Sequence, residues 1–77
     1  MIRLWLLSDD GDIVKYKYQP EDDEKGIILY SRSREATKVE DDILNNYPPT
    51  FYERLHSELK KFGDTNEFPT QKTIAMF

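Results

Sequence analysis

The residue best suited to acid–base chemistry in this sequence is His56, the only histidine of the chain. On a helix, His56 would lie about one turn after Tyr52 and Glu53, either of which could orient its ring. A general base also needs a nucleophile within hydrogen-bond reach, and the adjacent Ser57 would point to another part of the helix. We therefore expect His56 to lie at the boundary of an apolar stripe. A catalytic or ligand-binding role of His56 together with Tyr52 is the alternative function.

Acidic residues, whose carboxylates can bind a divalent metal ion, gather in three clusters: residues 9–12, residues 21–24 and residues 40–42. Aligning Gly11 with the glycine of a calcium-binding loop puts Lys17 where that loop needs its last carboxylate, so the match fails. Runs of like charge are usually solvated surface, and three separated glycines cannot form a phosphate-binding loop. The sequence therefore predicts no metal site, no cofactor and no catalytic residue, and it favours a protein that is not an enzyme.

Composition indicates one small domain over residues 1–77. Hydrophobic residues make up 38% of the chain and aromatic residues 13%, which is too many for a typical disordered protein. The chain has no cysteine, which excludes disulfides and thiolate metal sites, and its net charge is −4. Its N-terminal apolar run, Leu4 to Leu7, is far too short for a membrane span. We expect a soluble, cytoplasmic protein that makes no membrane contact.

Two strands are predicted at residues 2–7 and 13–18, because apolar and aromatic residues there flank an Asp-Gly turn at residues 10–11. Placing Ser8 opposite Asp12 gives a clean apolar face, whereas a slip of one residue mixes lysines into it. The apolar face then collects Ile2, Leu4, Leu6, Val14, Tyr16 and Tyr18.

A third strand is predicted at residues 26–31, whereas residues 36–47 allow two structures. Four apolar residues of this segment recur at helical spacing, which would make it a helix. Alternatively, residues 32–35 form a hairpin loop that leads into a fourth strand, with Val39 beside Ile28. We favour the strand.

An amphipathic helix is predicted at residues 50–62, directly after a pair of prolines. Its apolar stripe comprises Phe51, Tyr52, Leu55, Leu59 and Phe62. Gly63 would end the helix, and residues 73–77 would form a closing strand. The predicted fold class is therefore α+β: an antiparallel β-meander of three to four strands, with one amphipathic helix packed on one face and a C-terminal strand.

The sheet face turned away from this helix, called the outer face below, is the predicted interaction site. It would collect Arg3, Trp5, Leu7, Ile13, Lys15, Lys17, Ile27 and Leu29. A tryptophan among cations and aliphatic side chains is typical of interface cores, and Lys15 and Lys17 would shield the Trp5 ring. We expect a non-catalytic protein-interaction module whose partner is another protein or a second copy of the chain. The alternatives are nucleic-acid binding through Arg3, Trp5, Lys15 and Lys17, and coverage of this face by the chain's own C-terminal region.

Several short stretches give the chain a general resemblance to small uncharacterised bacterial proteins. They are Tyr18-Gln19-Pro20-Glu21, Gly26-Ile27-Ile28 and Ala75-Met76-Phe77, together with Tyr52 and His56 on the predicted helix. The resemblance implies a bacterial source, but neither an activity nor a set of site residues.

Overall fold

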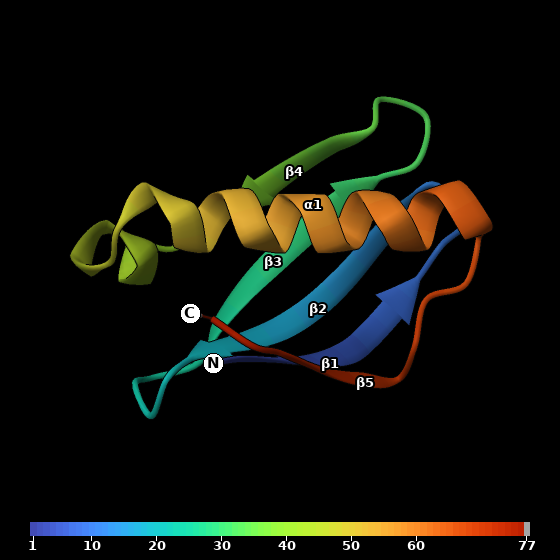
Figure 1. Ribbon diagram of the computed structural model, residues 1–77. Coiled ribbons are helices and arrows are strands. Elements are labelled where there is room, and N and C mark those ends of the chain that lie inside the picture. Colours follow the sequence, from blue (N-terminus) through green and yellow to red (C-terminus); the bar gives the residue numbers. More distant parts are fainter. Residues whose placement is uncertain (77) are drawn as a thin grey trace.

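One curved sheet and one long helix make up the fold of residues 1–76, which are the residues described by this computed structural model (Figure 1). The five strands are antiparallel, in the spatial order β4-β3-β2-β1-β5. Their bounds are β1 Ile2–Asp9, β2 Ile13–Pro20, β3 Gly26–Ser31, β4 Ala36–Val39 and β5 Gln71–Ile74. A 3-10 helix, η1 (Ile43–Asn46), leads into the helix α1 (Pro49–Thr65). The predicted α+β class is confirmed.

The segment 36–47 divides between strand β4 and the short helix η1, so the single helix that its apolar spacing allowed is wrong. Val39 of β4 lies opposite Ile28 of β3, as the favoured strand predicted. The loop between the two strands is fixed by a residue that is distant in sequence, because the Ser33 N–H donates to the Asp12 carboxylate at 2.8 Å. Tertiary contacts of this kind outweigh local spacing in a short segment.

The predicted pairing of Ser8 with Asp12 is wrong: Ser8 lies opposite Lys15, and Trp5 lies opposite Lys17 instead of Lys15. From Ile2 to Leu6, the partner of each β1 residue lies two positions further along β2 than predicted. A β-bulge just before Ser8 shifts the pairing by one more residue. Side chains alternate between the two faces with a period of two. A displacement of two therefore leaves the predicted core face and outer face unchanged.

The turn between β1 and β2 explains the different register. The Asp10 carboxylate accepts hydrogen bonds from the N–H groups of Asp12 at 3.0 Å and Ile13 at 2.7 Å. The Asp10 N–H in turn donates to the Ile13 carbonyl at 3.1 Å, which centres the turn on Gly11 and Asp12. Gly11 adopts a φ of +103°, which favours glycine.

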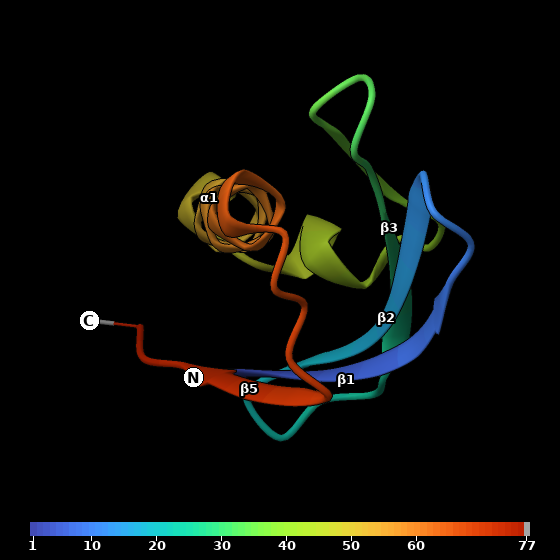
Figure 2. The ribbon, with the colours of Figure 1, turned by 90° about the vertical axis from the view of Figure 1, so that its right-hand side faces the viewer.

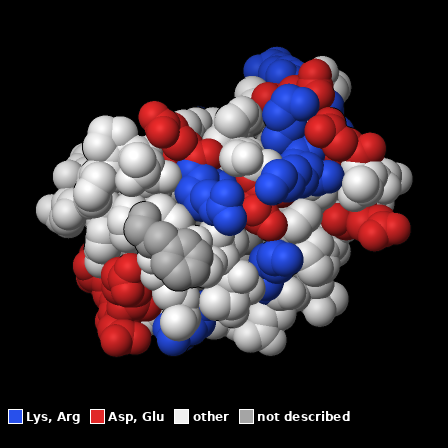
Figure 3. All heavy atoms as spheres, in the orientation of Figure 1, with Lys and Arg blue, Asp and Glu red and all other residues white. Residues whose placement is uncertain are grey.

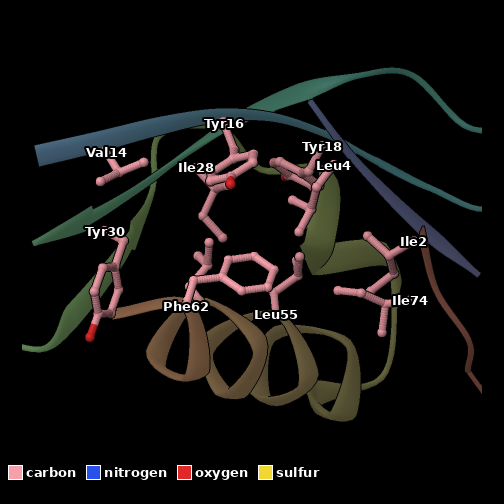
Figure 4. Close-up of a cluster of buried hydrophobic side chains, with 11 residues drawn as sticks. Ile2, Leu4, Val14, Tyr16, Tyr18, Ile28, Tyr30, Leu55, Phe62 and Ile74 are labelled. Atoms are coloured by element: carbon pink, nitrogen blue, oxygen red, sulfur yellow. The ribbon is translucent and has the colours of Figure 1, made fainter. Parts of the chain in front are cut away.

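The inner face of the sheet and one side of α1 enclose a single core (Figure 4). Its buried side chains are Ile2, Leu4, Val14, Tyr16, Tyr18, Ile28, Tyr30, Leu55, Leu59, Phe62 and Ile74. The sheet curves around α1, which lies on the concave side (Figure 2). Two of the tyrosines bury their rings but keep a partner for the hydroxyl group: Tyr16 donates to the Pro69 carbonyl at 2.6 Å, and Tyr18 donates to the Asp41 carboxylate at 2.5 Å.

Two positions of α1 differ from the predicted apolar stripe. Tyr52 is 40% exposed and lies at the rim of the core, whereas Glu58 is only 8% exposed. The Glu58 carboxylate lies 3.9 Å from Nζ of Lys72 on β5, so the buried acid has a partner of opposite charge.

The predicted helix stop at Gly63 is also wrong, because α1 continues to Thr65. Asn66 ends the helix with a φ of 54°, and its N–H donates to the Gly63 carbonyl at 3.2 Å. Gly63 instead permits close packing. A Cβ atom at this position would lie 2.9 Å from Cε2 and 3.0 Å from the hydroxyl oxygen of Tyr30. The missing side chain lets the last turns of the helix approach the sheet.

The closing strand spans Gln71–Ile74 rather than residues 73–77, and residue 77 lies outside the described residues. Its pairing with β1 starts where the Leu6 N–H donates to the Thr70 carbonyl at 2.9 Å. The pairing stops at Ile74 because Ile74 lies opposite Ile2, where β1 begins.

We predict that Leu59→Ala lowers the free energy of unfolding by about 2–5 kcal/mol, because Leu59 is fully buried in the core. Urea denaturation followed by circular dichroism measures this loss. Leu7→Ala is the matched control, since Leu7 is 45% exposed, and it should change stability little. A negligible loss for Leu59→Ala would show that α1 does not pack on the sheet as described.

We predict that Gly63→Ala destabilises the protein, although alanine favours a helix over glycine by about 1 kcal/mol. The added Cβ would overlap the buried Tyr30 ring, and overpacking of this kind costs about 1–3 kcal/mol. The control is Ser57→Ala at an exposed helix position, which should be neutral or slightly stabilising. If urea denaturation showed Gly63→Ala to be more stable than the wild type, the close contact with Tyr30 would be wrong.

Candidate functional site

The outer face is open: no helix or strand formed by residues 1–76 lies over it, and α1 and η1 both lie on the opposite side of the sheet (Figure 2). The predicted members in regular strand positions alternate with buried residues and so face this way. Leu7, at the bulge, is 45% exposed. Within the described residues, the C-terminal segment does not cover this face, because β5 extends the sheet at its edge instead.

Trp5 lies in a cross-strand row with Lys17 of β2 and Ile27 of β3. The cation nearest to its ring is not the predicted Lys15 or Lys17 but Lys25, whose Nζ lies 5.3 Å from the ring centroid. Lys25 belongs to the loop between β2 and β3 and lies two residues before Ile27 along the chain. The ring is half-buried by these neighbours on the sheet.

The neighbouring row of the outer face runs from Lys15 through Leu29 to Lys38 of β4. Beside it the surface is hollowed by a depression of about 370 Å³. The depression is lined by Asp12, Ile13, Leu29, Ser31, Ser33, Arg34, Ala36, Thr37 and Lys38. Sequence reasoning missed this hollow, because Arg34 and Ala36 reach it only through the β3–β4 hairpin.

The basic residues of the helix side are only partly paired: Lys60 has two acidic neighbours, whereas Arg54 and Lys61 take part in no ion pair among the described residues. On the helix side, basic and acidic side chains lie next to one another (Figure 3), and Lys60 lies 3.5 Å from both Glu35 and Asp64. Among the described residues, Lys15, Lys17 and Lys38 take part in no ion pair. The outer face therefore carries positive charge that is not neutralised on the spot.

His56 contacts an edge strand rather than an open site. Its Nδ1 lies 2.7 Å from the Thr37 hydroxyl of β4, and its ring stacks on Tyr52 with 6.5 Å between ring centroids. The Tyr52 hydroxyl donates to the Thr37 carbonyl at 3.0 Å. Among the described residues, no carboxylate is hydrogen-bonded to the other ring nitrogen of His56. Sequence reasoning did not connect Thr37 with His56. Through Thr37, His56 and Tyr52 together link α1 to β4.

One carboxylate in each acidic cluster is engaged within the fold: Asp10 by the N–H groups of Asp12 and Ile13, Asp23 by the Tyr47 hydroxyl, and Asp41 by three donors. Asp41 accepts hydrogen bonds from the Tyr18 hydroxyl and from the N–H groups of Ile27 and Ile43, at 2.5, 2.9 and 3.1 Å. Burial and this bond to Asp41 raise the pKa of Tyr18 well above its ordinary value. Within residues 1–76, no group of three metal-ligating side chains is found.

Arg32, another residue that sequence reasoning missed, ties three loops together. It donates to both carboxylate oxygens of Asp9, at 2.6 and 2.8 Å, and these bonds lower the pKa of that carboxyl to about 2. It also donates to the Asn66 side chain at 3.1 Å, and its guanidinium carbon lies 4.4 Å from the Phe68 ring centroid. This network joins the first hairpin to the C-terminal end of α1.

Comparisons of the chain with protein-family models, with curated proteins and with solved structures returned no match. Within the described part of the chain, no helix is long and apolar enough to cross a membrane.

We predict that the wild type is more stable than an Asp9→Asn variant at neutral pH, and that the difference disappears in acid. The Asp9 pKa is about 2 in the folded protein against an ordinary value of 3.8. A lowered folded-state pKa stabilises the fold above the ordinary value, and the contribution is lost as the pH falls from 3.8 to about 2. Urea midpoints of both proteins across this range measure it. A difference that stayed constant would contradict the Asp9–Arg32 interaction.

Proposed function

We propose that this protein is a small, non-catalytic protein-interaction module that binds another protein chain through the outer face. The observation that carries the proposal is the difference in burial between the two sheet faces. One is buried under α1, while the other leaves Trp5, Leu7, Ile27 and Leu29 beside unpaired lysines. Partly exposed apolar and aromatic side chains interspersed with cations are a common composition of interaction sites.

The two rival functions have weaker support. His56 and Tyr52 both form hydrogen bonds with Thr37 of β4. A catalytic or ligand-binding role would require these hydrogen bonds to break first. A stacking platform for nucleic acid needs accessible aromatic rings, whereas the only ring among the outer-face members, Trp5, already has Lys25 beside it. The lack of cysteine is in keeping with a cytoplasmic place of action, which we propose as well.

We predict that Trp5→Glu leaves the fold intact but abolishes binding of the partner chain. Glutamate places a charge at the centre of the apolar row, while Trp5 makes no contribution to the buried core. The measurement is chemical cross-linking in an extract of the protein's own cells, with urea denaturation of the purified variant to verify folding. The matched control is Ser57→Glu, which adds the same charge at an exposed position of α1 and should retain the cross-linked partner.

His56→Gln separates this proposal from catalysis or ligand binding at His56, and under our proposal it too retains the partner. Loss of biological effect in His56→Gln, without loss of stability, would favour the enzyme or ligand-binding alternative. Retention of the cross-linked partner in a folded Trp5→Glu variant would show that the outer face is not the interaction site.

A further inference from the structure

The charges of the outer face restrict what can cover it. Lys15 and Lys17 lie two residues apart on β2, and Lys38 lies in the same row as Lys15. A second copy of the chain in a two-fold contact would place the same patch of both copies, and so both sets of these lysines, in one interface. Like charges gathered in one interface are destabilising, and within one chain these three lysines take part in no ion pair among the described residues. The charge pattern therefore disfavours self-association through this face.

The hollow of the outer face fits an apolar side chain with acidic neighbours. Ile13, Leu29 and Ala36 provide apolar lining, and Arg34 and Lys38 add positive charge. The one carboxylate of the lining, Asp12, is engaged within the chain, since it accepts hydrogen bonds from the Ser33 N–H at 2.8 Å and the Ser31 hydroxyl at 3.2 Å. Bonds from Ser33 and Ser31 also lower the pKa of Asp12, so it stays charged and bound to them.

The spacing along β2 suggests the form of the partner. Ile13, Lys15 and Lys17 project to the same side at alternate positions, which are about 7 Å apart in an extended chain. A second extended chain laid along β2 presents its own alternate side chains at the same interval. An apolar residue next to the hollow is then followed, two and four positions along, by carboxylates that meet Lys15 and Lys17.

We propose that the outer face binds an extended acidic segment of another protein. The segment has one apolar and two acidic residues at alternate positions: the apolar side chain occupies the hollow, and the carboxylates pair with Lys15 and Lys17. The inference rests on the proposed function, and it specifies the partner's chemistry.

The probe is a capped peptide, Gly-Leu-Thr-Glu-Thr-Glu-Gly, together with its reversed sequence, titrated at low salt. Trp5 is the only tryptophan of the chain and lies opposite Lys17, so its fluorescence reports occupancy. We expect one of the two peptides to bind. Replacing both glutamates by glutamine should weaken binding about tenfold, because two exposed ion pairs are lost together. Replacing the leucine by serine should weaken it as well.

The variant that tests the charges is Lys15→Glu with Lys17→Glu, which should abolish binding of the acidic peptide. Its matched control is Arg54→Glu with Lys61→Glu, the same change in charge at exposed positions of α1, and this control should bind as the wild type does. Sedimentation velocity of the wild type should show a monomer.

Four results would overturn the inference. Two concern the peptide: equal binding of the glutamine peptide, or no peptide binding at all. The other two are a dimer that Trp5→Glu dissociates and preferential binding of a single-stranded oligothymidylate. The dimer would leave the proposed function standing, since a second copy is also a protein partner. The proposed function itself is tested separately: retention of the cross-linked partner by a folded Trp5→Glu variant would contradict it.

Discussion

Coverage of a five-stranded sheet by a single helix is the constraint on which the rest of this structure depends. A flat sheet would leave its margins bare, and the sheet instead curves around α1. Long side chains fill the remaining distance, notably the rings of Tyr16, Tyr18 and Tyr30. Where the helix must come closest, Gly63 provides the room beside Tyr30. The curvature of the sheet, the large side chains of the core and the glycine at position 63 thus all serve to cover five strands with α1.

The buried tyrosines also determine the surrounding loops. A phenol hydroxyl group buried without a partner is costly, so the loops must supply acceptors. The Pro69 carbonyl serves Tyr16, and the Asp41 carboxylate serves Tyr18 while also accepting the N–H groups of Ile27 and Ile43. Because α1 and η1 both lie on the inner side, no helix of residues 1–76 covers the opposite side. The same shortage that shapes the core thus leaves an apolar and basic surface without cover among the described residues.

Patterns that repeat along the chain could be predicted from the sequence, whereas contacts that join distant residues could not. Alternation identified the two faces of the β1–β2 hairpin, but alternation is unchanged by a shift of two residues, so the true partner of Trp5 was not determined. Gly63 fits a helix end and a close helix–sheet contact equally well, and only Tyr30 decides between them. Lys25 beside Trp5 and Arg32 beside Asp9 join residues far apart in sequence, which periodicity does not report.

The pairing of β1 with β5 has a consequence for the order of events during synthesis. β1 finds its first neighbour, β2, across a short turn, but its second neighbour consists of residues 71–74. Pairings between such distant segments form slowly, because the entropy cost of closing a long loop comes before any stabilising contact forms. We infer that the hairpins and α1 assemble first and that β5 attaches last. A nascent chain still lacking β5 carries an unpaired edge on β1, where a neighbouring nascent chain can add its own strand. The edge of β1 therefore stays open to such misassembly until β5 has been synthesised and has paired with it.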